Sequence, residues 1–241
     1  MASDNALSVQ RGNYAWTLPG PLLMIAGRLV CIPLQYAIIT ALPSTPTDLS
    51  FWPAALPAPP GPLAVFLGMT AVLVLKQSIW VLYICNEAVT LPFALFAGIA
   101  DFMYESICAA VFTRAPSIPL WRPWMLYAGA AVHASAALAE LAAELQRKRF
   151  KASPRNAGKL CASGLWGVVR HPNFALNVVY GAAYGFATAG PLFAGAPVAM
   201  YLSNFCYNAI PPKEAYLKGK YGDEWEGYRR VVRWKLFPGV Y

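Results

Sequence analysis

The sequence predicts an all-α membrane protein, a bundle of about six transmembrane helices that ends in a basic tail. Hydrophobic residues make up 58% of the 241-residue chain and charged residues only 12%. A typical soluble domain carries roughly 25% charged residues, so this chain has too little charge to cover a water-exposed surface. Its apolar residues also come in long uninterrupted runs. Both features indicate that a bilayer is the main solvent.

The individual segments follow from the apolar runs and the residues that interrupt them. The Pro-rich stretch 43–62 predicts a loop after the first run, because proline lacks a backbone donor and breaks helices. Asn86–Glu87 separates the second run from the third, and 113–123 separates the third from the fourth. The last two runs meet near Gly190–Pro191 and are short for a span of about 20 residues, which favours a tilted or partial hairpin. The expected segments are 19–41, 63–85, 88–112, 123–146, 174–189 and 191–210.

Charge placement predicts one membrane domain, 1–241, with both termini in the cytosol. Of 19 Lys and Arg, seven lie in 147–170 and seven in 213–235, on either side of the predicted hairpin. The positive-inside rule places both segments in the cytosol, and counting back over four segments places the N-terminus there too. The net charge of +8 therefore reflects membrane topology, and we do not expect nucleic acid as a partner.

Two further features limit the possibilities. Residues 1–16 lack the basic and apolar pattern of a cleaved signal peptide, so the first run is expected to remain in the mature protein. The five cysteines show no Cys-x-x-Cys pair and the chain has only two histidines, so no metal site is expected.

Charged residues inside the apolar runs are candidates for function. Each costs about 2.5–3.5 kcal/mol at membrane depth. Arg28, Lys76, Asp101 and Glu105 lie within runs, and Glu87 lies at a segment edge. Asp101 and Glu105 share one helix face, because they are four residues apart. They either pair with the cations to hold helices together or, with Glu87, supply a catalytic acid.

A motif begins at the end of the fourth segment. Residues 140–177 read ELAAELQRKRFKASPRNAGKLCASGLWGVVRHPNFALN. This stretch resembles the steroid 5-alpha-reductase-like membrane family, which includes sterol reductases. Glu144 stands where the family usually has Asp, Phe174 where it has Tyr, and Leu176–Asn177 where it has Gly-Glu. The tail 213–241 is similar to the end of sterol reductases. The matching motif positions are Glu140, Gln146, Phe150, Lys151, Pro154, Asn156, Gly164, Leu165, Trp166, Arg170, His171, Pro172 and Asn173.

The resemblance implies NADPH bound on the cytosolic side by the region 147–241, together with carboxylates from the preceding segment. Phosphate groups require converging Lys and Arg, tyrosines can stack on the cofactor or hydrogen-bond to it, and carboxylates and an amide can receive its ribose and carboxamide groups. The expected cofactor-binding residues are Glu140, Glu144, Gln146, Lys151, Arg170, His171, Asn173, Tyr216, Lys218, Tyr221, Tyr228 and Arg229.

Four functions fit the sequence. The resemblance favours an NADPH-dependent reductase that acts on a carbon–carbon double bond of a steroid, sterol or terpenoid-like lipid, with the endoplasmic reticulum as the expected membrane. The Arg-His-Pro-Asn-aromatic motif also occurs in isoprenylcysteine carboxyl methyltransferases, so an S-adenosylmethionine-dependent methyltransferase is an alternative. The Leu176–Asn177 departure leaves room for an isomerase or cyclase that needs no cofactor. The last possibility is a non-enzymatic scaffold.

Overall fold

The computed structural model describes residues 9, 10, 12–15, 17–41 and 60–241. Within these residues the chain is helical and contains no strand; an isolated backbone bridge joins Gln10 to Ala88. The all-α prediction is therefore confirmed. Most of the Pro-rich stretch expected as a loop, 42–59, lies outside the described residues.

Among the described residues, four helices are long and apolar enough to cross a membrane. They are α1 (Pro19–Ala41), α2 (Pro62–Ile79) with the π-helical turn η1 (Trp80–Ile84), α3 (Leu91–Phe112) and α4 (Trp124–Ala152). These four match the first four predicted segments, although α3 begins three residues later than expected and α4 continues into the basic stretch. Side chains such as Leu22, Leu95 and Ile107 leave about half of their surface exposed, as lipid-facing residues do.

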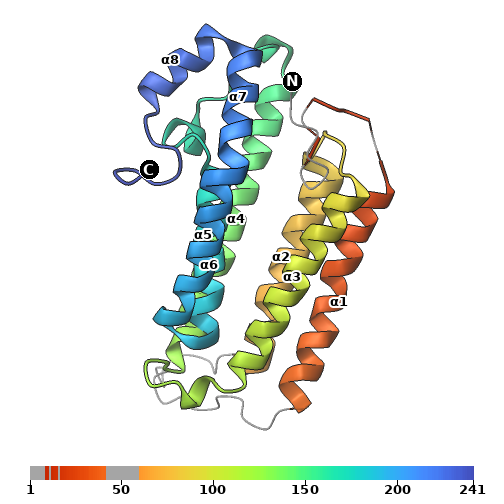
Figure 1. Ribbon diagram of the computed structural model, residues 1–241, viewed down its shortest axis with the longest axis vertical. Helices are drawn as coiled ribbons and strands as arrows, with labels where there is room; N and C mark the ends of the chain where they lie inside the picture. The colour runs from red at the N-terminus through yellow and green to blue at the C-terminus, as the bar shows by residue number, and fades with distance from the viewer. Residues whose placement is uncertain (1–8, 11, 16, 42–59) are drawn as a thin grey trace.

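The predicted hairpin is formed by α5 (Pro172–Ala189) and α6 (Pro191–Ser203). Proline begins both helices, where its missing N–H costs nothing, and Gly190 joins them with a φ of 84°. The two helices pack against each other, and α5 packs along α4 (Figure 1). That this hairpin crosses the membrane stays a prediction.

Beyond α6 the chain remains largely helical as far as Val231. The π-helical turn η5 (Asn204–Ala209) leads directly into α7 (Ile210–Tyr221), and α8 (Asp223–Val231) follows after Gly222. Residues 9, 10 and 12–15 lie at one end of the bundle with α7, α8 and the end of α4 (Figure 1). The two basic segments therefore share one end, as the charge pattern predicts. The assignment of this end to the cytosol stays a prediction.

Aromatic side chains and close contacts between helices stabilise the interior of the bundle. Phe66 stacks on Phe112 with ring centroids 4.4 Å apart, and Tyr184 meets Phe66 edge-on at 5.4 Å. Gly129 lets α4 approach α5, since a Cβ there would lie 2.7 Å from the Cβ of Ala187. These contacts fix the relative positions of the helices that carry the polar residues described next.

Candidate functional site

A pocket of about 400 Å³ lies at the basic end of the bundle. One wall is a single face of α4, because its lining residues follow the helical spacing i, i+3, i+4, i+7. A second wall is one face of α7 with the same spacing. The residues are Glu144, Arg147, Lys148 and Lys151 on α4, and Lys213, Tyr216, Leu217, Lys220 and Tyr221 on α7.

The remaining wall comes from the first half of the chain. The π-helical turn η1 contributes Trp80 and Ile84, and the connection to α3 contributes Glu87. Val9 and Tyr14 line the pocket from the segment that precedes α1. The pocket is therefore built by segments more than 200 residues apart in the sequence.

Positive charge is in excess in this pocket. The described lining contains five cationic side chains but only two carboxylates, Glu87 and Glu144. Arg147 pairs with Glu144, and Lys148 lies over the ring of Tyr83 with its Nζ 4.3 Å from the centroid. Lys151 donates to the hydroxyl of Tyr221 at 2.6 Å. A pocket with this balance is suited to a ligand that carries several negative charges.

Three buried acceptor atoms have no hydrogen-bond partner among the described residues. They are Oε1 of Glu144, Nδ1 of His171 and Oδ1 of Asn173. Buried polar atoms are rarely left unpaired in folded proteins. Glu144 is 1% exposed and lines the pocket, so a donor on a ligand would satisfy its free oxygen.

Arg170, His171 and Glu214 tie α7 to the start of α5. Arg170 and His171 both contact Oε1 of Glu214, at 2.8 and 3.1 Å. Burial lowers the pKa of His171 to about 4, so the ring is neutral at pH 7. Burial alone would raise the pKa of Glu214, but hydrogen bonds from His171 and Arg170 outweigh it and lower that pKa to about 2. This latch holds Lys213, the neighbour of Glu214, against the pocket.

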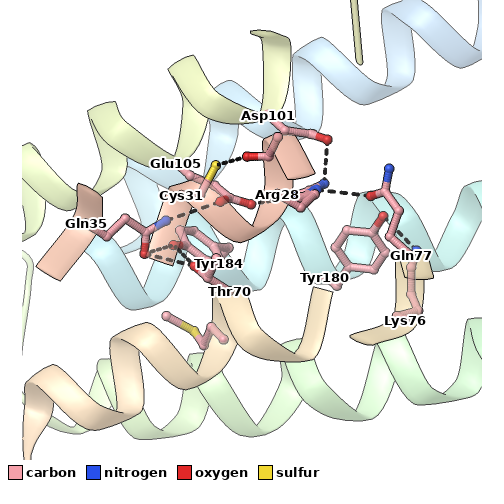
Figure 2. A network of polar contacts seen from close by, with 12 residues as sticks. Arg28, Cys31, Gln35, Thr70, Lys76, Gln77, Asp101, Glu105, Tyr180 and Tyr184 are labelled. Carbon is pink, nitrogen blue, oxygen red and sulfur yellow. Dashed lines mark hydrogen bonds and ion pairs between the residues drawn. The ribbon is translucent and has the colours of Figure 1, made fainter. Parts of the chain in front are cut away.

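A polar network lies between α1, α2, α3 and α5 inside the membrane-spanning part of the bundle (Figure 2). Arg28 contacts Asp101 at 2.8 Å and also pairs with Glu105. Its Nε donates to Gln77 at 3.0 Å. Gln35 donates to Glu105 at 3.2 Å. Both carboxylates reach one cation, and their spacing of four residues predicts only that they share a helix face.

A second ionic contact lies between α2 and α4. Lys76 pairs with Glu140 and donates to the hydroxyl of Tyr180 at 3.2 Å. Tyr180 in turn donates to Oδ1 of Asn177 at 2.6 Å. His133 is fully buried, and its two ring nitrogens contact backbone carbonyls of Tyr180 and Met69. His133 is thus accounted for by packing.

The structure gathers part of the predicted site and disperses the rest. Five predicted residues line the pocket: Glu87, Glu144, Lys151, Tyr216 and Tyr221. Asp101, Glu105 and Glu140 belong to the two intramembrane contacts. Arg170 and His171 form the latch, and Asn173 lies in the first turn of α5. The remaining predicted residues contact partners outside the described pocket. Gln146 contacts Ser163, and Tyr228 contacts Trp166. Lys218 and Arg229 both pair with Glu226.

Several lining residues were not predicted. Their helical spacing was present in the sequence, because Arg147 and Lys148 lie three and four residues after Glu144. The same spacing relates Lys213 to Tyr216 and Lys220. Tyr14 left no signal, because it reaches the pocket only through the path of the chain before α1.

The sequence of the chain is similar to one described protein family and to several known proteins. The model of a family described as "Protein of unknown function (DUF1295)" matches residues 73–233. The "Probable O-methyltransferase ustE" of Ustilaginoidea virens is 27% identical over 150 residues, which is 58% of this chain and 52% of that protein. The chain thus spans about half the length of this relative.

Sterol reductases match a shorter stretch. The Delta(14)-sterol reductase of Ascobolus immersus is 32% identical over 91 residues, 36% of this chain and 20% of that protein. The 7-dehydrocholesterol reductase of Danio rerio is 30% identical over 83 residues, 34% of this chain and 17% of that protein. The chain spans about a fifth of their length. These matches confirm the resemblance to the sterol reductase family.

Proposed function

Because the chain belongs to the DUF1295 family and is homologous to sterol reductases, we propose that it reduces a carbon–carbon double bond of a steroid, sterol or terpenoid-like lipid with NADPH. The observation that carries this proposal is the pocket in which five cationic side chains from α4 and α7 converge. The matches to sterol reductases support the class of reaction.

The residues of the pocket fit a dinucleotide. NADPH carries a pyrophosphate and a 2′-phosphate, and Arg147, Lys148 and Lys151 would bind such groups through charge-assisted hydrogen bonds. Tyr221 presents a ring and a hydroxyl beside them. The unpaired Oε1 of Glu144 would accept a hydrogen bond from a ribose hydroxyl or a carboxamide. When bound, NADPH would supply the hydride.

The polar network would supply the acid. In this proposal the substrate double bond is conjugated to a carbonyl, whose oxygen accepts a proton or hydrogen bond as negative charge develops. Asp101 and Glu105 share the single charge of Arg28, so one of the two can carry a proton without leaving Arg28 unpaired. The side chain of Asp101 is 23% exposed, whereas that of Glu105 is 2% exposed. Asp101 is therefore the group that a lipid could reach from the bilayer, and Glu87 in the pocket wall is the alternative.

One observation favours a second candidate. The methyltransferase-named relative matches over a longer stretch than the sterol reductases do. S-adenosylmethionine, the methyl donor, carries no phosphate groups, so its binding would not explain the excess of cations in the pocket. We therefore place this candidate second.

Ligand binding by the protein purified in detergent tests both candidates. A ligand at about 100 times its Kd adds roughly 2.7 kcal/mol to the stability of the native state. We expect NADPH to raise the melting temperature and the change Lys151→Ala to weaken this effect. Arg155→Ala, at an exposed basic residue outside the described pocket, is the matched control. A shift with S-adenosylmethionine alone would replace the reductase with the methyltransferase. No shift with either would refute both.

A further inference from the structure

Three polar groups converge on one rim of the pocket. Nζ of Lys220 lies 3.4 Å from the hydroxyl of Tyr14 and 3.3 Å from the hydroxyl of Tyr216. Both tyrosines and the lysine line the pocket. Tyr14 and Lys220 are 206 residues apart in the sequence, so the cluster exists only in the folded chain.

The segment that carries Tyr14 is held in place by hydrogen bonds to the connection between η1 and α3. The N–H of Ala88 donates to the carbonyl of Asn13 at 2.8 Å, and the N–H of Gly12 donates to Oε1 of Glu87 at 3.0 Å. Gly12 has a φ of 79°, a conformation that favours glycine. Tyr14 is therefore presented to the pocket from a fixed turn.

Lys220 differs from Arg147, on the facing wall of the pocket, in its partners. Arg147 is paired with a carboxylate. The described hydrogen bonds of Lys220 go to two neutral hydroxyls. Burial alone would lower the pKa of Lys220, but hydrogen bonds to Tyr216 and Tyr14 outweigh burial and raise the pKa above its usual value, so the group is charged at neutral pH. One ammonium and two hydroxyls form a cluster whose positive charge is not neutralised by these partners.

The cluster lies at the outer end of the pocket. Lys213 begins the lining face of α7, and Lys220 follows seven residues later, about 10 Å further along the helix axis. Lys213 lies near the end of α7 that continues from α6, and the predicted hairpin places this end nearer the membrane. A cofactor that reacts with a lipid must turn its reactive end toward the membrane, so its opposite end would reach Lys220.

We propose that Tyr14, Tyr216 and Lys220 form a subsite for a phosphate monoester, and that this group is the 2′-phosphate of NADPH. The inference rests on the proposed function for the identity of the ligand. An ammonium and two hydroxyl donors match the charge and the several acceptor oxygens of a phosphate dianion. The subsite therefore selects NADPH over NADH, which lacks the 2′-phosphate.

Dissociation constants for matched ligands, measured by calorimetry in phosphate-free buffer, test the subsite. The wild-type protein is expected to bind NADPH more tightly than NADH, and adenosine 2′,5′-bisphosphate more tightly than adenosine 5′-monophosphate. Loss of a hydrogen bond to a charged group weakens binding by roughly tenfold to a hundredfold. We expect Lys220→Gln and Tyr14→Phe to weaken NADPH binding by this factor and to leave NADH binding within about twofold.

The matched control is Arg155→Gln. Arg155 is an exposed cation outside the described pocket, so both affinities should stay unchanged. Melting temperatures without ligand verify that each variant folds. If NADPH binds but Lys220→Gln weakens the binding of NADPH and of NADH by the same factor, the subsite is refuted and the proposed function stands. If the wild type binds neither dinucleotide, the proposed function fails. The two adenosine phosphates then decide: a preference for the bisphosphate that Lys220→Gln abolishes supports the subsite, and equal affinities overturn it.

Discussion

Replacing Arg28 by methionine should destabilise the bundle strongly, because the change leaves two carboxylates without their cation. The Arg28 side chain is 7% exposed and contacts both Asp101 and Glu105. Methionine fills a similar volume but carries no charge. The variant Arg28→Met therefore removes the charge and its hydrogen bonds while leaving most of the packing between α1 and α3 in place.

The magnitude depends on which loss dominates. Hydrogen bonds between membrane helices contribute about 0.6 kcal/mol on average. Removing one member of a buried ion pair costs roughly 3–5 kcal/mol, because the remaining charge is left without compensation. The second effect should dominate for Arg28→Met. In a chain of this size a loss of 3–5 kcal/mol lowers the melting temperature by roughly 6–20 °C.

The assay is thermal unfolding in detergent, and a triple variant separates the two effects. Arg28→Met combined with Asp101→Asn and Glu105→Gln removes the uncompensated charge and should recover most of the lost stability. Arg155→Met, at an exposed position, should change the melting temperature little. If the single variant is no less stable than the triple variant, the charge of Arg28 does not stabilise the carboxylates and the reasoning is wrong.

Two further predictions concern packing and pH. Gly129→Val should destabilise the folded protein by about 1–3 kcal/mol through overpacking, since a Cβ there meets Ala187. The control is Gly195→Val, because nothing lies within 4 Å of a Cβ at that position. Equal melting temperatures of the two variants would contradict the close approach of α4 and α5. Acid should destabilise the protein, because the pKa of His171 is about 4 when folded and about 6.5 when unfolded. As the pH falls from 6.5 to 4, the His171 ring takes up a proton only in the unfolded chain, so the free energy of unfolding falls by about 3 kcal/mol. The low pKa of Glu214 adds a loss in the same direction at lower pH. The variant His171→Gln should flatten the stability profile between pH 6.5 and 4, and an unchanged slope would contradict the assignment.

The sequence predicts where the helices of this protein begin and end better than it predicts which helix faces meet. Apolar runs and proline positions locate α1 to α4 closely, since both are local properties of the chain. The spacing of Asp101 and Glu105 predicts their shared face, but no local pattern identifies Arg28 as the cation that meets both. Such a pairing depends on how α1 packs on α3.

The tail shows a different limit. Lys218 is among the expected cofactor-binding residues and Lys220 is not, yet of the two only Lys220 lines the described pocket. The π-helical turn η5 precedes α7, and its wider turns rotate all later side chains relative to an α-helix. Hydrophobic spacing assumes 3.6 residues per turn, so it gives no warning of this rotation. The position of Tyr14 depends on tertiary contacts alone.

The helical run from α6 through η5 to α7 is unbroken, so it would connect the bilayer rigidly to the pocket if the predicted hairpin crosses the membrane. A lipid that displaces α6 at membrane depth would tilt this run, and Lys213 and Lys220 would move with it. Occupancy on the lipid side would then alter the affinity for the nucleotide. Thermodynamic linkage requires the reverse effect to be of equal size, so the nucleotide would alter the affinity for the lipid through the same helix.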